Sequence, residues 1–221
     1  MTVAVLFARR DSIYKSLPGC DVWDIDRDAR LWPGGCPVVA HPPCRAWGRL
    51  RQFAKPRPDE KALALWAVGQ VRKFGGVLEH PAESSLWVDQ RLPRPDEFHD
   101  ESGGWSMEIE QYHWGHRAEK ATWLYIVGCS PTDIPPVPHR PGRATHCIRS
   151  SKGYPRLPYV TKPEREHTPL ALAEWLVTLA AKCGVGRPVQ MVCRCDLRTK
   201  LVGDGCEVCN PELAEGENNN D

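Results

Sequence analysis

The stretches PVVAHPPCRAWG, residues 37–48, and GVLEHP, residues 76–81, decide the fold of this chain of 221 residues. Each begins with or contains a short apolar run of the kind that forms a buried strand. Between them, apolar residues from Pro58 to Phe74 recur with a period of 3.6, which predicts a helix that ends at Gly75-Gly76. A strand, a crossover helix and a second strand place both strands parallel in one sheet. The sequence therefore predicts an α/β fold.

Further elements are expected on both sides of this unit. The polar, Pro/Gly-rich residues 89–104 predict a loop, and residues 129–165 predict a longer irregular loop that is basic. The other expected elements are strands at residues 3–8, 21–26, 107–112 and 121–127 and a terminal helix from Thr168 to Cys183, which Thr168-Pro169 would cap.

Composition sets the class of protein and its organisation. Hydrophobic residues make up 41% and charged residues 26%, which excludes a fibrous repeat, wholesale disorder and a membrane bundle. Without a signal-like N-terminus or a long apolar run, we expect a cytoplasmic protein that does not enter a membrane, with its oligomeric state open. We expect a catalytic domain at residues 1–185, a Cys-rich element at 190–210 and a disordered tail at 211–221.

A thiol and a carboxyl group are expected to share one pocket. Pro42 and Pro43 stiffen the turn that carries Cys44 beyond the end of a strand. Glu79 ends the parallel neighbour strand, so both groups should project from the carboxyl edge, where α/β sheets bind ligands. Alone, a cysteine is usually a small buried hydrophobe, and a glutamate before Pro81 could simply cap a turn. Their joint placement favours a nucleophile and an acid.

Four cysteines near the C-terminus have the spacing of a structural zinc site. Two close pairs of thiolates, separated by ten residues that include a Gly-Asp-Gly turn, match a tetrahedral Zn²⁺ site, and reduced thiols without metal are the alternative. The predicted ligands of this knuckle or ribbon are Cys193, Cys195, Cys206 and Cys209.

Basic residues follow the Pro-Pro-Cys turn and fill the loop 129–165, where Tyr154 and Tyr159 are interleaved. Basic loops with aromatic side chains suit phosphate neutralisation and base stacking, although charge runs are more often solvated surface. The residues that we expect to bind nucleic acid are Arg49, Arg51, Arg140, Arg143, Arg149 and Lys152.

These motifs resemble the cytosine-C5 DNA methyltransferase family. Pro42-Pro43-Cys44, with Trp47 three residues later, is similar to the family's nucleophile loop, and Glu79 matches its Glu-Asn-Val motif, with His80-Pro81 at the last two positions. Lys120-x-Thr122, after an aromatic-Gly turn, resembles the family's late motif. The resemblance covers residues 3–183, and the small recognition region is similar to that of phage and prophage versions.

The resemblance implies a Rossmann-like methyltransferase sheet, reduced in size, that acts on DNA. Cys44 would add to C6 of cytosine, which makes C5 nucleophilic. Glu79 would assist at N3 with a pKa raised by its buried site. Arg45 or Lys120 would supply the positive field that favours the thiolate.

The resemblance also implies S-adenosylmethionine as the methyl donor. The cofactor residues would be Phe7, Asp24, Asp26 and Pro42, with an aspartate holding the ribose hydroxyls. The chain departs from the family here, because Arg9-Arg10 stands in place of a Gly-rich turn and would suit a phosphate better.

Two alternatives stay open. One is a pyrimidine-modifying enzyme with the same Cys44 and Glu79 chemistry that uses another donor or a nucleotide substrate, which Arg9-Arg10 favours. The other is a zinc- and DNA-binding protein without enzymatic activity on a degenerate methyltransferase fold, which the basic residues 140–165 favour as much as they favour the enzyme.

Overall fold

The computed structural model describes residues 1–148, 157–184, 192–193 and 200–201. The chain divides into two compact units, Met1–Arg187 and Pro188–Asp221. In the second unit the described residues form two short antiparallel strands, β7 (Val192–Cys193) and β8 (Lys200–Leu201). All other elements belong to the first unit.

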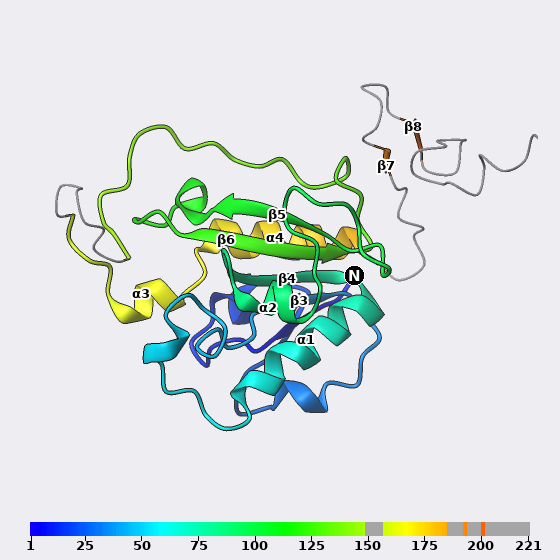
Figure 1. Ribbon diagram of the computed structural model, residues 1–221, viewed down its shortest axis with the longest axis horizontal. Coiled ribbons are helices and arrows are strands. Elements are labelled where there is room, and N and C mark those ends of the chain that lie inside the picture. Colours follow the sequence, from blue (N-terminus) through cyan, green and yellow to red (C-terminus); the bar gives the residue numbers. More distant parts are fainter. Residues whose placement is uncertain (149–156, 185–191, 194–199, 202–221) are drawn as a thin grey trace, which may run out of the picture. The chain divides into compact units, whose positions relative to one another are not determined.

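The first unit is built on a six-stranded mixed sheet with the order β2-β1-β3-β4-β6-β5 (Figure 1). The first four strands along the chain run parallel, as the predicted strand, helix and strand unit implies. Strands β6 and β5, the predicted pair of late strands, are added antiparallel at one side. The strands are β1 (Val3–Leu6), β2 (Cys20–Trp23), β3 (Val38–Ala40), β4 (Gly76–Pro81), β5 (Trp105–Glu110) and β6 (Ala121–Val127).

Two helices cover the two faces of the sheet. The apolar stripe of α1 (Glu60–Phe74), with Ala64, Ala67 and Val71, packs with one set of alternating strand residues. The apolar stripe of α4 (Leu170–Lys182), with Leu172 and Leu176, packs with the other set. Because successive strand residues point to opposite faces, both faces of the near-continuous apolar strands are buried.

Two glycines join α1 to β4. Gly75 has a φ of 75° and its N–H donates to the Val71 carbonyl, which ends the helix. A Cβ at Gly76 would lie 2.0 Å from the Val38 carbonyl oxygen, so only glycine lets β4 approach β3 this closely.

Three strands end earlier than the sequence predicts. Strand β5 stops at Glu110 because a single turn begins at Gln111. Strand β1 stops at Leu6 because Phe7 adopts a φ of 61°. Strand β2 stops at Trp23 because the Asp24 carboxylate accepts from the backbone N–H groups of Asp26 and Arg27, which turns the chain.

The helices also differ in detail from the expectation. Helix α1 begins at Glu60, after Pro58. The short helix α2 (Ser85–Asp89) precedes the loop 89–104, and α3 (Lys162–Glu166) forms in the stretch expected to be irregular, because the Thr161 side chain caps it. Single turns complete the unit: η1 (Ile13–Ser16), η2 (Ala29–Leu31), η3 (Arg51–Phe53) and η4 (Gln111–Trp114). Within the described ranges, every helix is too short or too polar to cross a bilayer.

Candidate active site

The Pro-Pro-Cys turn and Glu79 lie at the same edge of the sheet, as the sequence predicts. Strands β3 and β4 pair in parallel with Ala40 opposite Leu78. The chain then runs from β3 directly into His41 and on to Cys44, while Glu79 is the next residue of β4. The carbonyl of Cys44 accepts from the N–H groups of Trp47 and Gly48, at 3.0 and 2.8 Å, which fixes the turn.

The Glu79 carboxylate is held by two donors. Its Oε2 lies 2.9 Å from Nδ1 of His41, and its Oε1 lies 3.1 Å from Nε2 of Gln111. Gln111 also donates to the Thr122 hydroxyl at 3.0 Å, and that hydroxyl donates to the Lys120 carbonyl at 3.1 Å. Residues from the turn after β3, from η4 and from β6 therefore orient one carboxylate on β4.

The ionisation of Glu79 is opposite to the expectation. Burial raises the pKa of this carboxyl, but the His41 hydrogen bond and the Lys120 ammonium, together with smaller electrostatic contributions from the His41 and His80 rings, outweigh burial and lower the pKa to about 2. The prediction of a raised pKa was wrong because it counted burial and omitted the donors. Glu79 is a carboxylate at neutral pH.

His41 connects this carboxylate to η1. Its Nε2 lies 2.9 Å from the Tyr14 hydroxyl, and Tyr14 is buried. Because an ionised carboxylate only accepts hydrogen bonds, Nδ1 of His41 carries a proton. Burial raises the pKa of Tyr14, with the Glu79 charge adding to the effect, so Tyr14 stays a neutral phenol. His41 is thus a hydrogen-bonding residue that positions Glu79.

Cys44 is half-buried beside both charged groups. Burial and the Glu79 charge raise the pKa of its thiol. The Lys120 ammonium acts in the opposite direction and lowers the pKa, but by less. In the free protein the thiol is therefore predominantly protonated at neutral pH. Its reactivity depends on the balance between one carboxylate and one ammonium group.

The two predicted cations, Lys120 and Arg45, have different surroundings. The Arg45 guanidinium lies 2.8 Å from Oε1 of Glu60, a buried residue in the first turn of α1. Arg45 therefore anchors the turn to α1, and its catalytic assignment stays a prediction. Within the described residues, half-buried Lys120 has no carboxylate at ion-pair distance, while its charge acts on both Cys44 and Glu79.

His80 follows Glu79 on β4 and is fully buried. Among the described residues its ring nitrogens make no hydrogen bond of normal geometry. Burial lowers the pKa of His80 to about 4, against the opposing effects of the Glu79 charge and the Pro43 backbone. His80 is a neutral core residue at physiological pH.

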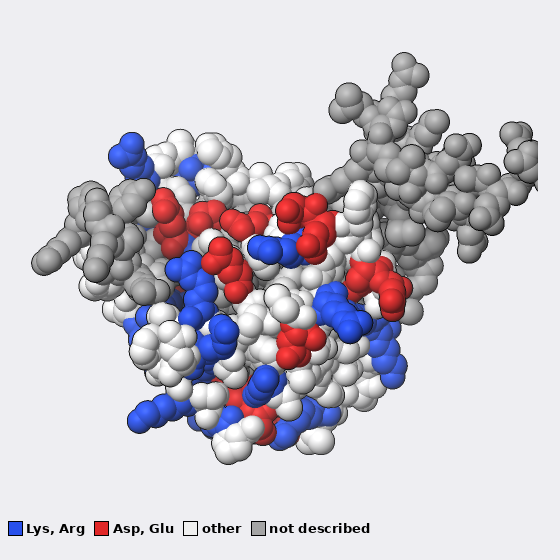
Figure 2. All heavy atoms as spheres, in the orientation of Figure 1, with Lys and Arg blue, Asp and Glu red and all other residues white. Residues whose placement is uncertain are grey.

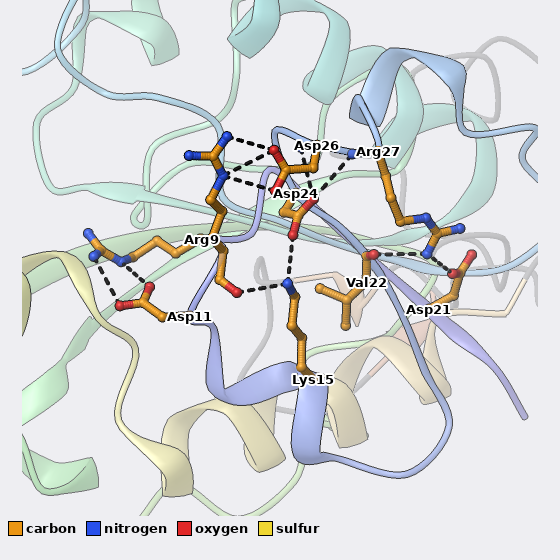
Figure 3. A network of polar contacts seen from close by, with 9 residues as sticks. Arg9, Asp11, Lys15, Asp21, Val22, Asp24, Asp26 and Arg27 are labelled. Atoms are coloured by element: carbon orange, nitrogen blue, oxygen red, sulfur yellow. Dashed lines mark hydrogen bonds and ion pairs between the residues drawn. The ribbon is translucent and has the colours of Figure 1, made fainter.

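Ion pairs fill the edge where the nucleoside cofactor is expected (Figure 3). Oδ2 of Asp24 lies 2.7 Å from the Lys15 ammonium, and its Oδ1 accepts two backbone N–H groups. Asp26 binds the Arg10 guanidinium through both oxygens, the shortest contact being 2.6 Å. Both carboxylates are therefore occupied by cations of the protein itself.

Phe7 directly follows β1, where the resemblance implies a Gly-rich turn with room for a cofactor. It takes a positive φ of 61°, and its ring packs edge-on against Trp66 with centroids 5.7 Å apart. Pro42 is buried in the neighbouring turn. The resemblance implies that Asp24 or Asp26 binds the ribose of S-adenosylmethionine. This does not fit the structure, because both carboxylates are paired with cations of the protein and the Phe7 side chain stands in the turn.

Arg9 and Arg10 are also paired. Arg9 contacts Asp11 at 2.9 Å and Glu166 at 2.5 Å, and Arg10 binds Asp26. Both guanidinium groups therefore already have carboxylate partners, and their expected preference for a phosphate stays a prediction.

The predicted nucleic-acid residues fall into separate places. Arg49 pairs with Glu83 at 3.1 Å, and Arg51 lines an open cleft beside α2. The Arg140 guanidinium lies 4.6 Å from the centroid of the Tyr112 ring, and Arg143 is exposed. Two further predicted residues, Arg149 and Lys152, lie outside the described residues.

The predicted zinc ligands cannot be placed around a metal. Cys195, Cys206 and Cys209 lie outside the described residues, and for Cys193 only the backbone strand is described. Elsewhere in the described part of the chain, no group of three or more His, Cys, Asp or Glu side chains has the arrangement of a metal site.

Sequence reasoning missed Tyr14 and Gln111. Tyr14 sits in a single turn with no motif around it, so no sequence signal marks it. Gln111 falls inside the strand expected at residues 107–112, whereas in the structure it directly follows β5, so no sequence signal placed it at the edge of the sheet. Thr122 was part of the late motif without an assigned role.

No family model matches the chain, and comparisons with curated proteins and with solved structures also find no match.

Proposed function

We propose that this protein modifies C5 of a pyrimidine base, with Cys44 as the nucleophile. The observation that carries the proposal is the grouping of three groups at the carboxyl edge of β3 and β4: one thiol, one ionised carboxylate and one ammonium that has no ion-pair partner in the described part of the chain. Cytosine in DNA is the substrate that the resemblance to cytosine-C5 methyltransferases implies.

In the first step the Cys44 thiol gives its proton to water, and the resulting thiolate adds to C6. The new S–C6 bond forms as the electron pair of the C5–C6 double bond moves toward C5 and N3. Glu79 accepts a hydrogen bond from the exocyclic amino group, and its charge makes N3 more basic, so N3 takes a proton from water as charge accumulates. Lys120 stabilises the thiolate before the addition.

The second step takes place at C5. The resulting enamine carbon forms a bond to an electrophile, and C5 then loses its original proton to water. Elimination of the thiolate restores the C5–C6 double bond as N3 returns its proton to water. When the electrophile is a proton from solvent, this sequence exchanges the C5 hydrogen and needs no donor.

The second candidate keeps this chemistry with a donor other than S-adenosylmethionine, or with a nucleotide substrate. The ion pairs Lys15–Asp24 and Arg10–Asp26 favour it, because they occupy the carboxylates that a ribose would need. Calorimetric titration with S-adenosylmethionine distinguishes the two candidates: micromolar binding would support the methyl donor, and no heat of binding would support another donor.

A third candidate is a zinc- and DNA-binding protein without activity. Trapping with 5-fluorocytosine in DNA separates it from the enzyme, because fluorine cannot leave C5 as a proton after C5 has reacted. With a working donor we expect an adduct that survives denaturation for the wild type and is absent for Glu79→Gln. Equal trapping by the Gln variant would remove Glu79 from the mechanism.

A further inference from the structure

An open cleft of about 690 Å³ lies beside α2, apart from the residues that hold Glu79. Helix α2 and the segment that follows it, residues 91–100, line most of the cleft, and Trp123 of β6 lines it from the sheet. The volume is within the ordinary range for ligand sites. None of the steps proposed for Cys44 uses this cleft.

Three arginines of the cleft lack an acidic partner. Within the described residues, Arg51, Arg91 and Arg94 have no carboxylate at ion-pair distance, and all three are exposed. Arginine guanidinium groups in such a position suit phosphate oxygens, which they bind in a bidentate manner.

The acidic residues at the same cleft are already engaged. Glu83 pairs with Arg49 at 3.1 Å, and Asp100 pairs with Arg72 at 3.1 Å. The Glu97 carboxylate accepts from the backbone N–H of Arg94 at 2.8 Å. Among the described residues, the cleft therefore presents three guanidinium groups without an acidic partner, against one carboxylate, that of Glu97, without a cationic partner. On the face drawn in Figure 2, Asp and Glu side chains gather over β5 and β6, while Lys and Arg predominate below them.

Aromatic side chains accompany these cations. The Phe98 ring is 63% exposed, which leaves an apolar face open to a ligand. The Arg94 guanidinium lies 5.7 Å from the centroid of the Trp123 ring, and Trp87 packs edge-on against Trp123. Unpaired bases stack on exposed rings and on guanidinium planes, whereas bases inside a duplex cannot.

The cleft leads toward the Pro-Pro-Cys turn. A second cavity of about 380 Å³ shares Arg51, Ser85 and Val88 with it and is also lined by Ala46 and Trp47. The backbone N–H and the hydroxyl of Ser85 each donate to the Trp47 carbonyl at 3.0 Å. Helix α2 is thus fixed to the turn that carries the nucleophile.

We propose that this cleft binds a single-stranded segment of DNA, with successive phosphates on Arg51, Arg91 and Arg94 and a base stacked on Phe98. Three unpaired cations in one open cleft exceed what a single nucleotide monophosphate needs. The assignment of the strand as the substrate rests on the proposed function, whereas binding by the cleft does not.

The test measures the salt dependence of binding to a fluorescein-labelled 12-nucleotide oligo(dT) by fluorescence anisotropy between roughly 50 and 200 mM NaCl. Each phosphate contact on a single strand contributes about 0.7 to the slope of log K against log salt. We expect the variant R91Q/R94Q to reduce the slope by about 1.4. The charge-matched control R10Q/R30Q, which removes two paired arginines, should leave the slope unchanged.

Two further variants complete the test. We expect Phe98→Ala to weaken binding about tenfold with an unchanged slope, because stacking does not release counterions. Cys44→Ser should bind as the wild type does, so a failure of the chemistry and a failure of binding are separate results. The proposal is overturned if R91Q/R94Q keeps the wild-type slope, if R140Q/R143Q alone carries the loss, or if duplex DNA binds more tightly than the single strand.

Discussion

Oε2 of Glu79 lies 2.9 Å from Nδ1 of His41, the residue that precedes the Pro-Pro-Cys turn. One hydrogen bond thus ties the carboxylate of β4 to the loop that carries the nucleophile. The second ring nitrogen of His41 is held by Tyr14, so the ring and the carboxylate are both fixed in orientation before any substrate binds.

The charges around Cys44 predict how its thiol titrates. The Glu79 charge raises the pKa of the thiol and the Lys120 charge lowers it. We therefore expect Glu79→Gln to lower the pKa of Cys44 and Lys120→Met to raise it, with several-fold faster and slower alkylation at pH 7, respectively. The measurement is the pH dependence of iodoacetamide labelling of Cys44 by peptide mass spectrometry.

The control for this experiment is Glu83→Gln, which removes an exposed carboxylate that pairs with Arg49. It should leave the labelling of Cys44 at the wild-type rate. If Glu79→Gln and Glu83→Gln behave alike, the grouping of Cys44 with Glu79 is wrong.

Burial of His80 predicts a loss of stability in mild acid. The pKa of His80 is about 4 in the folded protein and about 6.5 when exposed, so the unfolded chain binds an additional proton between these values. The stability is fully present above pH 6.5 and falls by about 3 kcal/mol toward pH 4. Urea unfolding of the wild type and of His80→Phe at pH 6.5 and pH 4 measures this change in the free energy of unfolding. The variant should lose correspondingly less stability between the two pH values.

This result separates His80 from Glu79. The lowered pKa of Glu79, about 2, stabilises the folded protein above the ordinary pKa of about 4.5, and that contribution is lost only as the pH falls toward 2. An equal loss of stability in the wild type and in His80→Phe between pH 6.5 and pH 4 would show that His80 is not held neutral.

The Cys-rich tail predicts bound metal. We expect about one zinc per chain, held by Cys193, Cys195, Cys206 and Cys209, and lost on removal of residues 190–221. The sheet should survive this truncation, because α4 already covers its face within the unit Met1–Arg187. Elemental analysis and circular dichroism of both forms check this. Zinc retained by the truncated protein would place the metal elsewhere.

The sequence predicted the α/β fold because the spacing of apolar residues within each strand and helix depends on that segment alone. Apolar runs gave the strands, and the stripe of Ala64, Ala67 and Val71 gave α1. Strand ends were less predictable: β2 stops at Trp23 because the Asp24 side chain captures backbone N–H groups, an interaction that hydropathy does not register.

The sequence predicted which residues form the site better than it predicted their ionisation and charge pairing. Cys44 and Glu79 follow from parallel pairing, since parallel strands end at one edge. The ionisation of Glu79 depends on Gln111 and His41, which approach from other elements, and the pairing of Arg45 with Glu60 depends on how the turn meets α1. Such long-range contacts are set by the tertiary fold.

The most direct test of the central claim is exchange of the C5 hydrogen in deuterium oxide, since it needs the thiol and no donor. Single-stranded DNA and deoxycytidine monophosphate are each incubated with the wild type and with Cys44→Ser, and the recovered nucleosides are analysed by mass spectrometry. We predict that deoxycytidine gains one deuterium with the wild type, from DNA more than from the nucleotide, and gains none with Cys44→Ser. Equal exchange by both proteins, or no exchange by the wild type on either substrate, would contradict the assignment of Cys44 as the nucleophile.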